Sequence, residues 1–404
     1  MNKPQDYQKL FMDMNSFFAS VEQQVHPPLR GEAIGIAPYT GNSGCIIAAS
    51  QEAKKAGIKT GCKVGEAKRI YPQIKILESR PALYQLYHQE IIKTLFSFSP
   101  FVKILSIDEM TIPLDQDEQN RETALKIGNV IKAKIKEKVG DYLTCSVGAG
   151  PNQFLAKAAA ESKKPDGLTI VSLKELPSFY QKMGLLNLCG INVKMQYILN
   201  KIGIKTALDF YQAKMSNLVC LLGHPGKMWY LRLRGFEVDN FISKTATVGR
   251  SCVLTPQYRH RQGAEKVLIK LAAKVAYRLR KERLLTAGLS LYISFLGQNS
   301  QRQFCKIPTT SNSHDILRTA SNLFNKINFN APPILIYLTA FHLSSGQKPR
   351  SLFANLEKIT RTSEAMDQIN DQFGPETVSF AKILDIEDAA PDRIPFGRPR
   401  YEVG

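Results

Sequence analysis

The sequence predicts an α+β protein of several domains, and three patterns along the chain support this prediction. Strand-forming segments alternate with helical patterns up to about residue 171, a mainly helical stretch follows, and a strongly basic segment comes after it. A length of 404 residues suggests two to four domains, and 44% hydrophobic with 22% charged residues is ordinary for globular proteins. A fibrous, low-complexity or mainly disordered protein is therefore excluded.

Helical spacing of apolar residues separates three segments rich in strand formers in the first part of the chain. We expect strands at 10–12, 102–114 and 143–147, and helices at 16–24, 82–96, 121–139 and 152–162. This alternation predicts a mixed sheet with helices packed on it. Residues 176–235 are almost wholly helical with short breaks that contain glycine, which predicts a small helical module.

The basic segment has its own pattern and predicts a separate domain. Residues 244–306 contain thirteen Lys or Arg and two acidic residues, a net charge of +11. Strands are expected at 248–254, 288–296, 302–307 and 334–343, with an amphipathic, basic-faced helix at 263–283 and a second helix at 314–327. A polar stretch before the segment predicts a linker at 237–247. The tail at 347–404 is acidic, with a helical pattern at 365–373.

The overall charge indicates the class of partner. Lys and Arg number 54 against 35 acidic residues, a formal net charge of +19, which favours a polyanion, with nucleic acid first and a generically basic surface as the alternative. The seven cysteines form no C-x-x-C pair, so neither a zinc knuckle nor a disulfide framework is predicted. The chain shows no signal peptide, and its longest apolar stretch is about half of a ~20-residue membrane span. We expect a soluble, cytoplasmic protein without a membrane partner.

Three acidic residues are the first candidates for chemistry. Asp13 ends the apolar segment KLFMDM just before a helix, where an isolated Asp is more often a helix cap. Asp108 and Glu109 stand side by side in an apolar, strand-like run, and burying both is costly unless a cation compensates their charge. Two Mg²⁺ ions ~4 Å apart would do so. The alternative is that Asp108 and Glu109 cap a solvent-exposed hairpin. For Asp115 and Asp117, which follow in a polar turn, we favour a solvent-exposed loop.

Glycines and paired lysines mark a third feature. In SVGAGPNQFLAK, residues 146–157, glycines between a strand and a helix permit close backbone approach. In KKPDG, residues 163–167, two lysines precede a turn and offer positive charge to phosphate. The pattern is not a Walker P-loop, because G-x-x-x-x-G-K-[ST] is absent.

Together these blocks resemble the signatures of Y-family translesion DNA polymerases. DMNSFFASVEQ at 13–23, SIDE at 106–109, SVGAGPNQFLAK and KKPDG stand in the family's order and spacing, and EAKKAGIKTG at 52–61 and VGR at 248–250 agree. The resemblance covers residues 7–345. It implies a right-hand polymerase, with a ferredoxin-like palm at 7–17 and 80–171, small fingers at 18–79, a helical helix-hairpin-helix thumb at 172–236 and an α+β little finger at 248–346.

The resemblance implies error-prone translesion DNA synthesis by two-metal nucleotidyl transfer without proofreading. Such a protein belongs to DNA repair and the SOS response to DNA damage, with mutator activity. Asp13, Asp108 and Glu109 match the family's metal-binding carboxylates, and the Met14 carbonyl is a further expected ligand. Two Mg²⁺ ions are expected, with Mn²⁺ as an alternative.

The nucleotide site follows from the same resemblance. Phe18 stands at the family's steric gate against a ribose 2′-hydroxyl, while Phe17 is expected to be the buried core ring. Lys164 matches the lysine that meets the triphosphate, with Lys163 as the alternative. Gln51 and Lys54 stand where many members have Tyr and Arg, and Lys cannot grip a phosphate bidentately. Asn15 stands where many members have a second Asp, away from the metal-ligand positions.

DNA contacts are expected in the thumb and the little finger. Gly190 and Asn192 resemble a helix-hairpin-helix G-I-G turn with Asn for the second glycine, since Asn tolerates left-handed backbone. Arg250, Arg302 and Lys306 lie on strand-like segments and are expected to contact DNA phosphates. The lysine stripe of the helix at 263–283 is expected to be solvated.

Two alternatives remain open, and several partners are implied. The chain could be a non-catalytic DNA-binding accessory subunit of a mutagenesis complex, or a palm-fold nucleotide cyclase, although neither would need all the features above. The expected partners are primer–template DNA and a dNTP, for a monomer in the cytoplasm at the nucleoid. An activating accessory subunit is a further option. No clear sliding-clamp peptide is present, and IPFG at 394–397 is its degenerate candidate.

Overall fold

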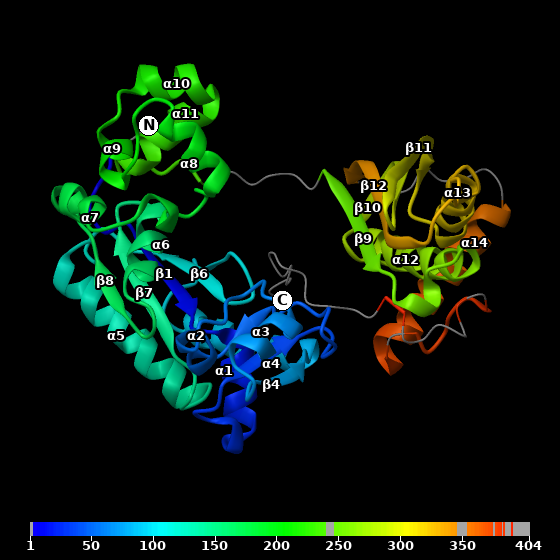
Figure 1. The fold of residues 1–404 in the computed structure, drawn as a ribbon, viewed down its shortest axis with the longest axis horizontal. Helices are drawn as coiled ribbons and strands as arrows, with labels where there is room; N and C mark the ends of the chain where they lie inside the picture. The colour runs from blue at the N-terminus through cyan, green and yellow to red at the C-terminus, as the bar shows by residue number, and fades with distance from the viewer. Residues whose placement is uncertain are drawn as a thin grey trace. The chain divides into compact units, whose positions relative to one another are not determined.

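The computed structural model describes residues 3–239, 246–345, 354–374, 376–381, 383 and 389–390, without the side chains of 354–360. The described residues divide into two compact units, one up to residue 239 and the other from residue 246 to 390. This boundary falls inside the predicted linker 237–247, of which residues 240–245 lie outside the described part. Figure 1 shows the elements of both units.

A five-stranded sheet forms the centre of the first unit, in the order β5-β6-β1-β7-β8. β1 is antiparallel to both β6 and β7, and β7 is parallel to β8. The strands are β1 (Lys9–Met14), β5 (Lys103–Ile104), β6 (Glu109–Pro113), β7 (Cys145–Gly150) and β8 (Leu168–Ile170).

Helices cover both faces of this sheet because the side chains of β1 alternate. Leu10 and Met12 pack in one core with α4 (Pro81–Phe96) and α5 (Arg121–Lys138), whereas Phe11 packs against Ala156 and Ala160 of α6 (Gln153–Ser162). Gly148 allows α6 to approach closely, because a Cβ there would lie 2.1 Å from the Ala156 carbonyl oxygen. This confirms the close approach predicted from the glycines.

A second, smaller sheet in the first unit has its own hydrophobic cluster. Its order is β3-β2-β4, with β2 antiparallel to β3 and parallel to β4. Ala53, Ile58, Val64 and Ala67 are among the residues of its core. The elements of this region are α1 (Phe17–Val25), β2 (Ile34–Ala37), β3 (Ala48–Ala49), α2 (Gln51–Lys55), α3 (Val64–Ile70) and β4 (Lys75–Glu78).

The helical stretch predicted at 176–235 is confirmed. Trp229 lies in its core, edge-on to Phe154 of α6 and tilted against Phe210. Its helices are α7 (Leu176–Gln181), α8 (Val193–Asn200), α9 (Ala207–Gln212), α10 (Met215–Leu222) and α11 (His224–Leu233), with a 3-10 turn η3 (Leu185–Asn187) before α8.

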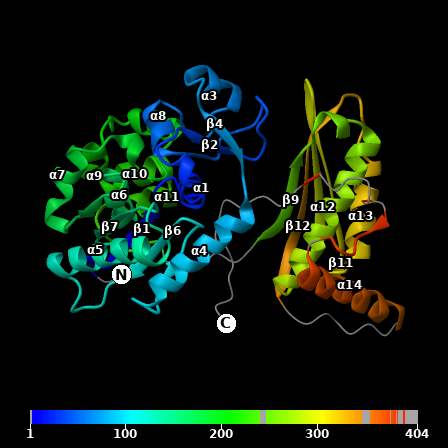
Figure 2. The ribbon, with the colours of Figure 1, turned by 90° about the horizontal axis from the view of Figure 1, so that it is seen from below.

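The second unit contains an antiparallel sheet in the order β11-β10-β12-β9, with α12 and α13 on one face (Figure 2). The predicted succession of strand, helix, two strands, helix and strand is confirmed. Its elements are β9 (Thr247–Val253), α12 (Arg261–Lys281), β10 (Leu284–Phe295), β11 (Gln298–Thr310), α13 (Ser313–Asn325) and β12 (Pro333–Ser345).

The described part of the acidic tail packs on α12, which corrects one prediction. We predicted a solvated lysine stripe on this helix. Instead, Glu376, which follows α14 (Ala354–Phe373), forms an ion pair with Lys270 at 2.8 Å. Lys270 is buried, at 2% exposed. Arg280 of α12 binds Asp367 of α14 through two nitrogens at 2.5 and 2.7 Å. The physical reason is charge complementarity between a basic helix and an acidic segment.

A second correction concerns the predicted strand at 102–114. It is broken at residues 105–108 by a tight turn between β5 and β6, in which the Leu105 and Ser106 amides donate to the Glu109 carbonyl. Apolar composition alone could not reveal this break. Among the described residues, no helix combines the length and the apolar character that a membrane span requires.

Candidate active site

Strand pairing brings the first two acidic residues together. Asp13 on β1 and Glu109 at the start of β6 are directly paired in the antiparallel register, so their side chains share one face of the sheet. That face is the one that α6 covers. Asp108 precedes Glu109 in the turn, and its carbonyl accepts a hydrogen bond from the Met14 amide at 2.9 Å. Asp108 and Glu109 therefore lie at a hairpin, as the alternative interpretation predicted. Their side chains, however, are half-buried and not fully exposed to solvent.

A cavity of about 630 Å³ collects the predicted site residues. Such a volume is within the range of small-molecule sites. The predicted residues that line it come from the sheet, from α1, from the region of α2 and from the KKPDG loop: Asp13, Met14, Phe18, Gln51, Lys54, Asp108, Glu109 and Lys164.

The structure adds Glu161, which sequence reasoning missed. Oxygen atoms of Asp13, Glu109 and Glu161 all lie within 4.8 Å of one another, the sole such acidic group found in the described part of the chain. Asp108 lines the same cavity but is outside this group, and its Oδ1 accepts a hydrogen bond from Ser106 Oγ at 2.5 Å. A signal was present in the sequence, because Lys157 and Glu161 are four residues apart on one helix face.

Two lysines partly balance these carboxylates. Lys164 Nζ lies 2.9 Å from Asp13 Oδ2 and 2.5 Å from Glu161 Oε1. Lys157 Nζ lies 2.6 Å from Glu109 Oε1. Burial alone would lower the pKa of both lysines, but these contacts outweigh it and raise their pKa overall. Both lysines therefore stay protonated beside the acids.

Burial and mutual repulsion perturb the carboxylates. Burial raises the pKa of Asp13 to about 7, with smaller contributions from the charges of Asp108 and Glu161. Burial also raises the pKa of Asp108, and the charge of Glu109 adds to the shift. Lys54 also lines the cavity; loss of water around its ammonium group lowers its pKa, and the charge of Lys164 adds to the effect. Loss of hydration is therefore the main cost of keeping these groups charged in the cavity.

The burial predicted for Phe17 is confirmed, but Phe18 is buried as well, so the two rings of α1 do not differ in exposure. Phe17 is 3% and Phe18 is 5% exposed, and both line the cavity. Phe18 is fixed by stacking on Tyr84 of α4, with ring centroids 4.6 Å apart. Its position is therefore set by packing between α1 and α4, which no local pattern encodes.

Asn15 has a structural task at the same end of β1. It is 3% exposed; its Nδ2 donates to Ser146 Oγ at 2.9 Å, and its Oδ1 accepts from the Asp166 amide at 2.7 Å. These bonds tie the KKPDG loop, which includes Lys164, to β1 and β7. Gln51 also lines the cavity, and its Nε2 donates to Ser16 Oγ at 3.0 Å.

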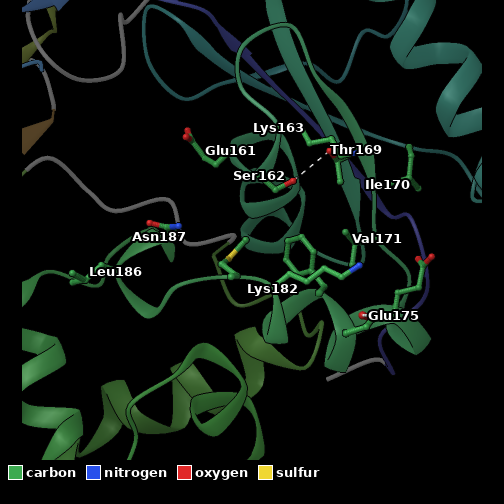
Figure 3. Close-up of a pocket in the computed structure, with 13 residues that line it drawn as sticks. Glu161, Ser162, Lys163, Thr169, Ile170, Val171, Glu175, Lys182, Leu186 and Asn187 are labelled. Carbon is green, nitrogen blue, oxygen red and sulfur yellow. Dashed lines mark hydrogen bonds between the residues drawn. The ribbon is translucent and has the colours of Figure 1, made fainter. Parts of the chain in front are cut away.

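The two lysines of KKPDG line different cavities. A second cavity has a volume of about 720 Å³, and Lys163, Thr169, Lys182 and Asn187 are among its lining residues (Figure 3). Glu161 lines both cavities. Lys164, and not Lys163, lies in the acidic cavity. The alternative assignment of Lys163 therefore finds no support in the geometry.

The hairpin at residues 189–192 is built differently from the prediction. Gly190 has a φ of +91° and provides the left-handed residue of the turn. Asn192 is extended, with a φ of −105°, and caps α8 through a hydrogen bond from the Met195 amide to its Oδ1. Its contribution is thus an N-cap and not a replacement for a left-handed glycine.

The register of the second sheet separates the three predicted basic residues. Arg302 pairs with Tyr292 and Lys306 with Gly288, and both basic side chains are exposed on the face away from α12 and α13. Arg250 pairs instead with Leu338, which is fully buried, so Arg250 belongs to the helix-covered face of the edge strand β9. The three do not form one surface.

Comparisons with known proteins agree with this architecture. Residues 12–161 match the impB/mucB/samB family, and residues 245–352 match the impB/mucB/samB family C-terminal domain. The DNA polymerase IV of Moorella thermoacetica is 31% identical, with 93% of this chain and 96% of the relative covered. That of Pelotomaculum thermopropionicum is 30% identical, with 93% and 95% covered.

Solved structures show the same fold. A Y-family DNA polymerase chimera of Dbh and Dpo4 superposes with a TM-score of 0.72 at 22% identity, over 84% of this chain and 99% of that one. The insertion ternary complex of Dbh DNA polymerase gives 0.58 at the same identity and coverage. The fold and the acidic cavity define a Y-family DNA polymerase. The chain belongs to the impB/mucB/samB family, whose members compared above are DNA polymerases IV.

Proposed function

We propose that this chain is a DNA-directed DNA polymerase of the polymerase IV type, which copies past damaged bases by metal-dependent nucleotidyl transfer. The observation that supports it most directly is the cavity in which Asp13, Asp108 and Glu109 meet Phe18 and Lys164. The first unit divides accordingly into palm, fingers and thumb, with the boundaries predicted above, and the second unit is the little finger. The absence of proofreading and the resulting errors are part of the same proposal.

The donor set of the cavity fits a hard divalent cation. Every acidic ligand candidate offers carboxylate oxygen, which Mg²⁺ prefers, and burial raises the pKa values of Asp13 and Asp108, because their ionised forms lose hydration that a cation would replace. Asp13, Asp108 and Glu109 would hold two ions, with the Met14 carbonyl as a further ligand and Mn²⁺ as a substitute. When bound, such ions favour the deprotonated primer hydroxyl and stabilise charge on the leaving pyrophosphate.

The chain's own residues bind and orient the dNTP. Lys164 and Lys54 offer positive charge to the triphosphate, and Gln51, which lines the same cavity, offers an amide donor. Because Lys164 is held between Asp13 and Glu161, it is positioned before the nucleotide arrives. The Phe18 ring, fixed against Tyr84, excludes a ribose 2′-hydroxyl by its volume. Selection of deoxynucleotides is thus steric.

Primer–template DNA is bound at two places on the chain. The turn at Gly190, with Asn192 as the cap of α8, presents backbone amides to a phosphate. Arg302 and Lys306 contact phosphates from the open sheet face, without sequence preference and with a marked salt dependence. Arg250 acts from the other face of its strand, and its contribution is a positioning one within the little finger.

The cellular setting remains a proposal of the same kind. We place the protein in the cytoplasm at the nucleoid, as a monomer on DNA that acts in the SOS response. A sliding clamp and an activating accessory subunit are further proposed partners. The clamp-peptide candidate at 394–397 lies outside the described residues.

Primer extension with Mg²⁺, on an undamaged template and on one with an abasic site, tests the function. Wild type should extend both primers, and Asp108→Ala should lose at least about a hundredfold in rate while it still binds the primer–template. Asp117→Ala, in the exposed loop after β6, is the matched control and should behave as wild type. Folded wild-type protein that binds DNA but extends nothing would contradict the proposal.

A further inference from the structure

One acidic residue of the catalytic cavity has no task in the proposed function. Four of the residues that line this cavity are acidic: Asp13, Asp108, Glu109 and Glu161. The first three are the proposed cation ligands, which leaves Glu161 without a role. A carboxylate oxygen of Glu161 nevertheless lies within 4.8 Å of oxygens of Asp13 and Glu109. Its charge therefore acts on whatever the cavity binds.

The place of Glu161 in α6 is unfavourable for the helix itself. Glu161 lies in the last turn, one residue before the helix ends at Ser162. The C-terminal end of a helix has partial negative charge, so an acidic side chain there is repelled. In Figure 3 the Glu161 carboxylate points away from Ser162 and Thr169. Helix formation does not account for a glutamate at this position, and its contact with Lys164 is the interaction that offsets the repulsion.

Lys164 divides its hydrogen-bonding capacity between two carboxylates. Its Nζ lies 2.9 Å from Asp13 Oδ2 and 2.5 Å from Glu161 Oε1. A lysine ammonium group has three N–H donors, so these contacts leave one donor for a phosphate oxygen. The proposed function assigns Asp13 to cations. Glu161 is therefore the carboxylate that competes with a triphosphate for Lys164.

The charge of Glu161 acts in the same direction as this competition. A phosphate bound at Lys164 would lie close to the Glu161 carboxylate, because both would contact the same ammonium group. The two negative groups repel each other, and the repulsion is stronger in a partly buried site than in open water. The Lys164 side chain is only 30% exposed, so water screens this repulsion incompletely. Both effects lower the affinity for a triphosphate.

We propose that Glu161 is a positioning residue that holds Lys164 in an ion pair and thereby lowers the affinity of the cavity for the triphosphate of a dNTP. This inference rests on the proposed function, because it deepens the role assigned there to Lys164. Glu161 does not touch the reacting atoms and acts through Lys164. A nucleotide must displace this ion pair before Lys164 can donate fully to it. The site therefore binds dNTP weakly, while the chemical step after binding is little affected.

Calorimetric titration of the full chain with inorganic tripolyphosphate in excess Mg²⁺ measures this competition without primer or template. Glu161→Gln keeps the length of the side chain and one oxygen acceptor but removes the charge. It should bind tripolyphosphate roughly three- to tenfold more tightly than wild type. Glu161→Asp keeps the charge and should remain within about twofold of wild type.

Glu90→Gln is the matched control. Glu90 Oε1 pairs with Lys93 Nζ at 2.7 Å and at the same spacing of three residues, but on α4 and outside the cavity. The substitution changes the net charge equally and should leave the affinity for tripolyphosphate unchanged. A gain of affinity in this control equal to that of Glu161→Gln would assign the effect to overall charge and overturn the proposal.

Primer extension at varied dNTP concentration provides the kinetic measurement. Glu161→Gln should lower the KM for the dNTP by a factor similar to its gain in tripolyphosphate affinity and leave kcat within about twofold. An unchanged affinity of Glu161→Gln for tripolyphosphate would overturn the proposal. A weaker affinity would also overturn it, because Glu161 would then help Lys164 to bind phosphate. Protein that binds tripolyphosphate as expected but extends no primer would contradict the proposed function and leave the competition for Lys164 standing.

Discussion

The acidic cavity of the first unit and the basic surface of the second unit are opposites in charge but follow one rule. In the cavity, the carboxylates Asp13, Glu109 and Glu161 exceed what Lys157 and Lys164 balance. In the second unit, Lys270 and Arg280 of α12 are paired with acids of the tail, whereas the strand positions that share a face with Arg302 and Lys306 include no acidic residue. The charge that remains after internal pairing, and not the total charge, indicates where a ligand of opposite charge binds.

The largest expected effect tests the ion pairs between α12 and the acidic tail. Arg280→Ala removes the partner of Asp367 and bonds to the Ser311 carbonyl and Ser313 Oγ, in a contact whose two side chains are 10% and 19% exposed. We expect the free energy of unfolding of the second unit to fall by about 3 kcal/mol. The only tryptophan, Trp229, lies in the first unit. The urea transition should therefore shift in circular dichroism and not in tryptophan fluorescence.

Arg318→Ala is the control for that variant. Its ion pair with Asp315 is longer, at 3.5 Å, and the Arg318 side chain is 67% exposed, so we expect little change in stability. Equal behaviour of the two variants would mean that the contact of α12 with the tail contributes nothing, and the comparison above would fail.

The second effect tests the surplus of acid in the cavity. The pKa of Asp13 is about 7 in the folded protein against 3.8 ordinarily, so between these values only the folded state holds the proton, and stability falls as pH rises. Asn carries no charge in either state. In EDTA, Asp13→Asn should therefore have a Tm a few degrees above wild type at pH 8, and the two should converge near pH 4.

Tryptophan fluorescence during heating measures this difference in the first unit. Asp117→Asn serves as the control, because Asp117 is exposed and should show no such crossover. If wild type is instead more stable than Asp13→Asn at pH 8 without metal, Lys164 more than compensates the charge of Asp13. That result would contradict a surplus of negative charge in the cavity.

The smallest effect concerns the open sheet face. Arg302→Ala and Lys306→Ala should each weaken duplex binding severalfold at low salt and reduce the slope of log affinity against log salt by about 1. Arg250→Ala should change this slope less, because the register places Arg250 on the other face. Titrations of the full chain at several salt concentrations provide the measurement. An equal change in slope for all three variants would contradict the assignment of faces.

Most of the second unit could be predicted from the sequence. The α12 helix and its neighbouring strands have clear periods of 3.6 and 2 residues, and these periods depend only on neighbours along the chain. The break at residues 105–108 could not be predicted in this way, because apolar composition continues through it while the backbone bonds to Glu109 turn the chain. The role of Asn192 could not be predicted either, since Asn is favoured both as a helix cap and in a left-handed turn.

The sequence by itself determined the order of the elements, the acids at the end of β1 and at the start of β6, and the excess of positive charge, because these depend on residue type and local spacing. Only the tertiary structure decided that Glu161 joins Asp13, that Arg250 is separated from Arg302, and that Glu376 of the tail pairs with Lys270 of α12. The physical reason is that strand register and helix packing bring together residues far apart in the chain. A shift of one residue in either would exchange which side chains meet.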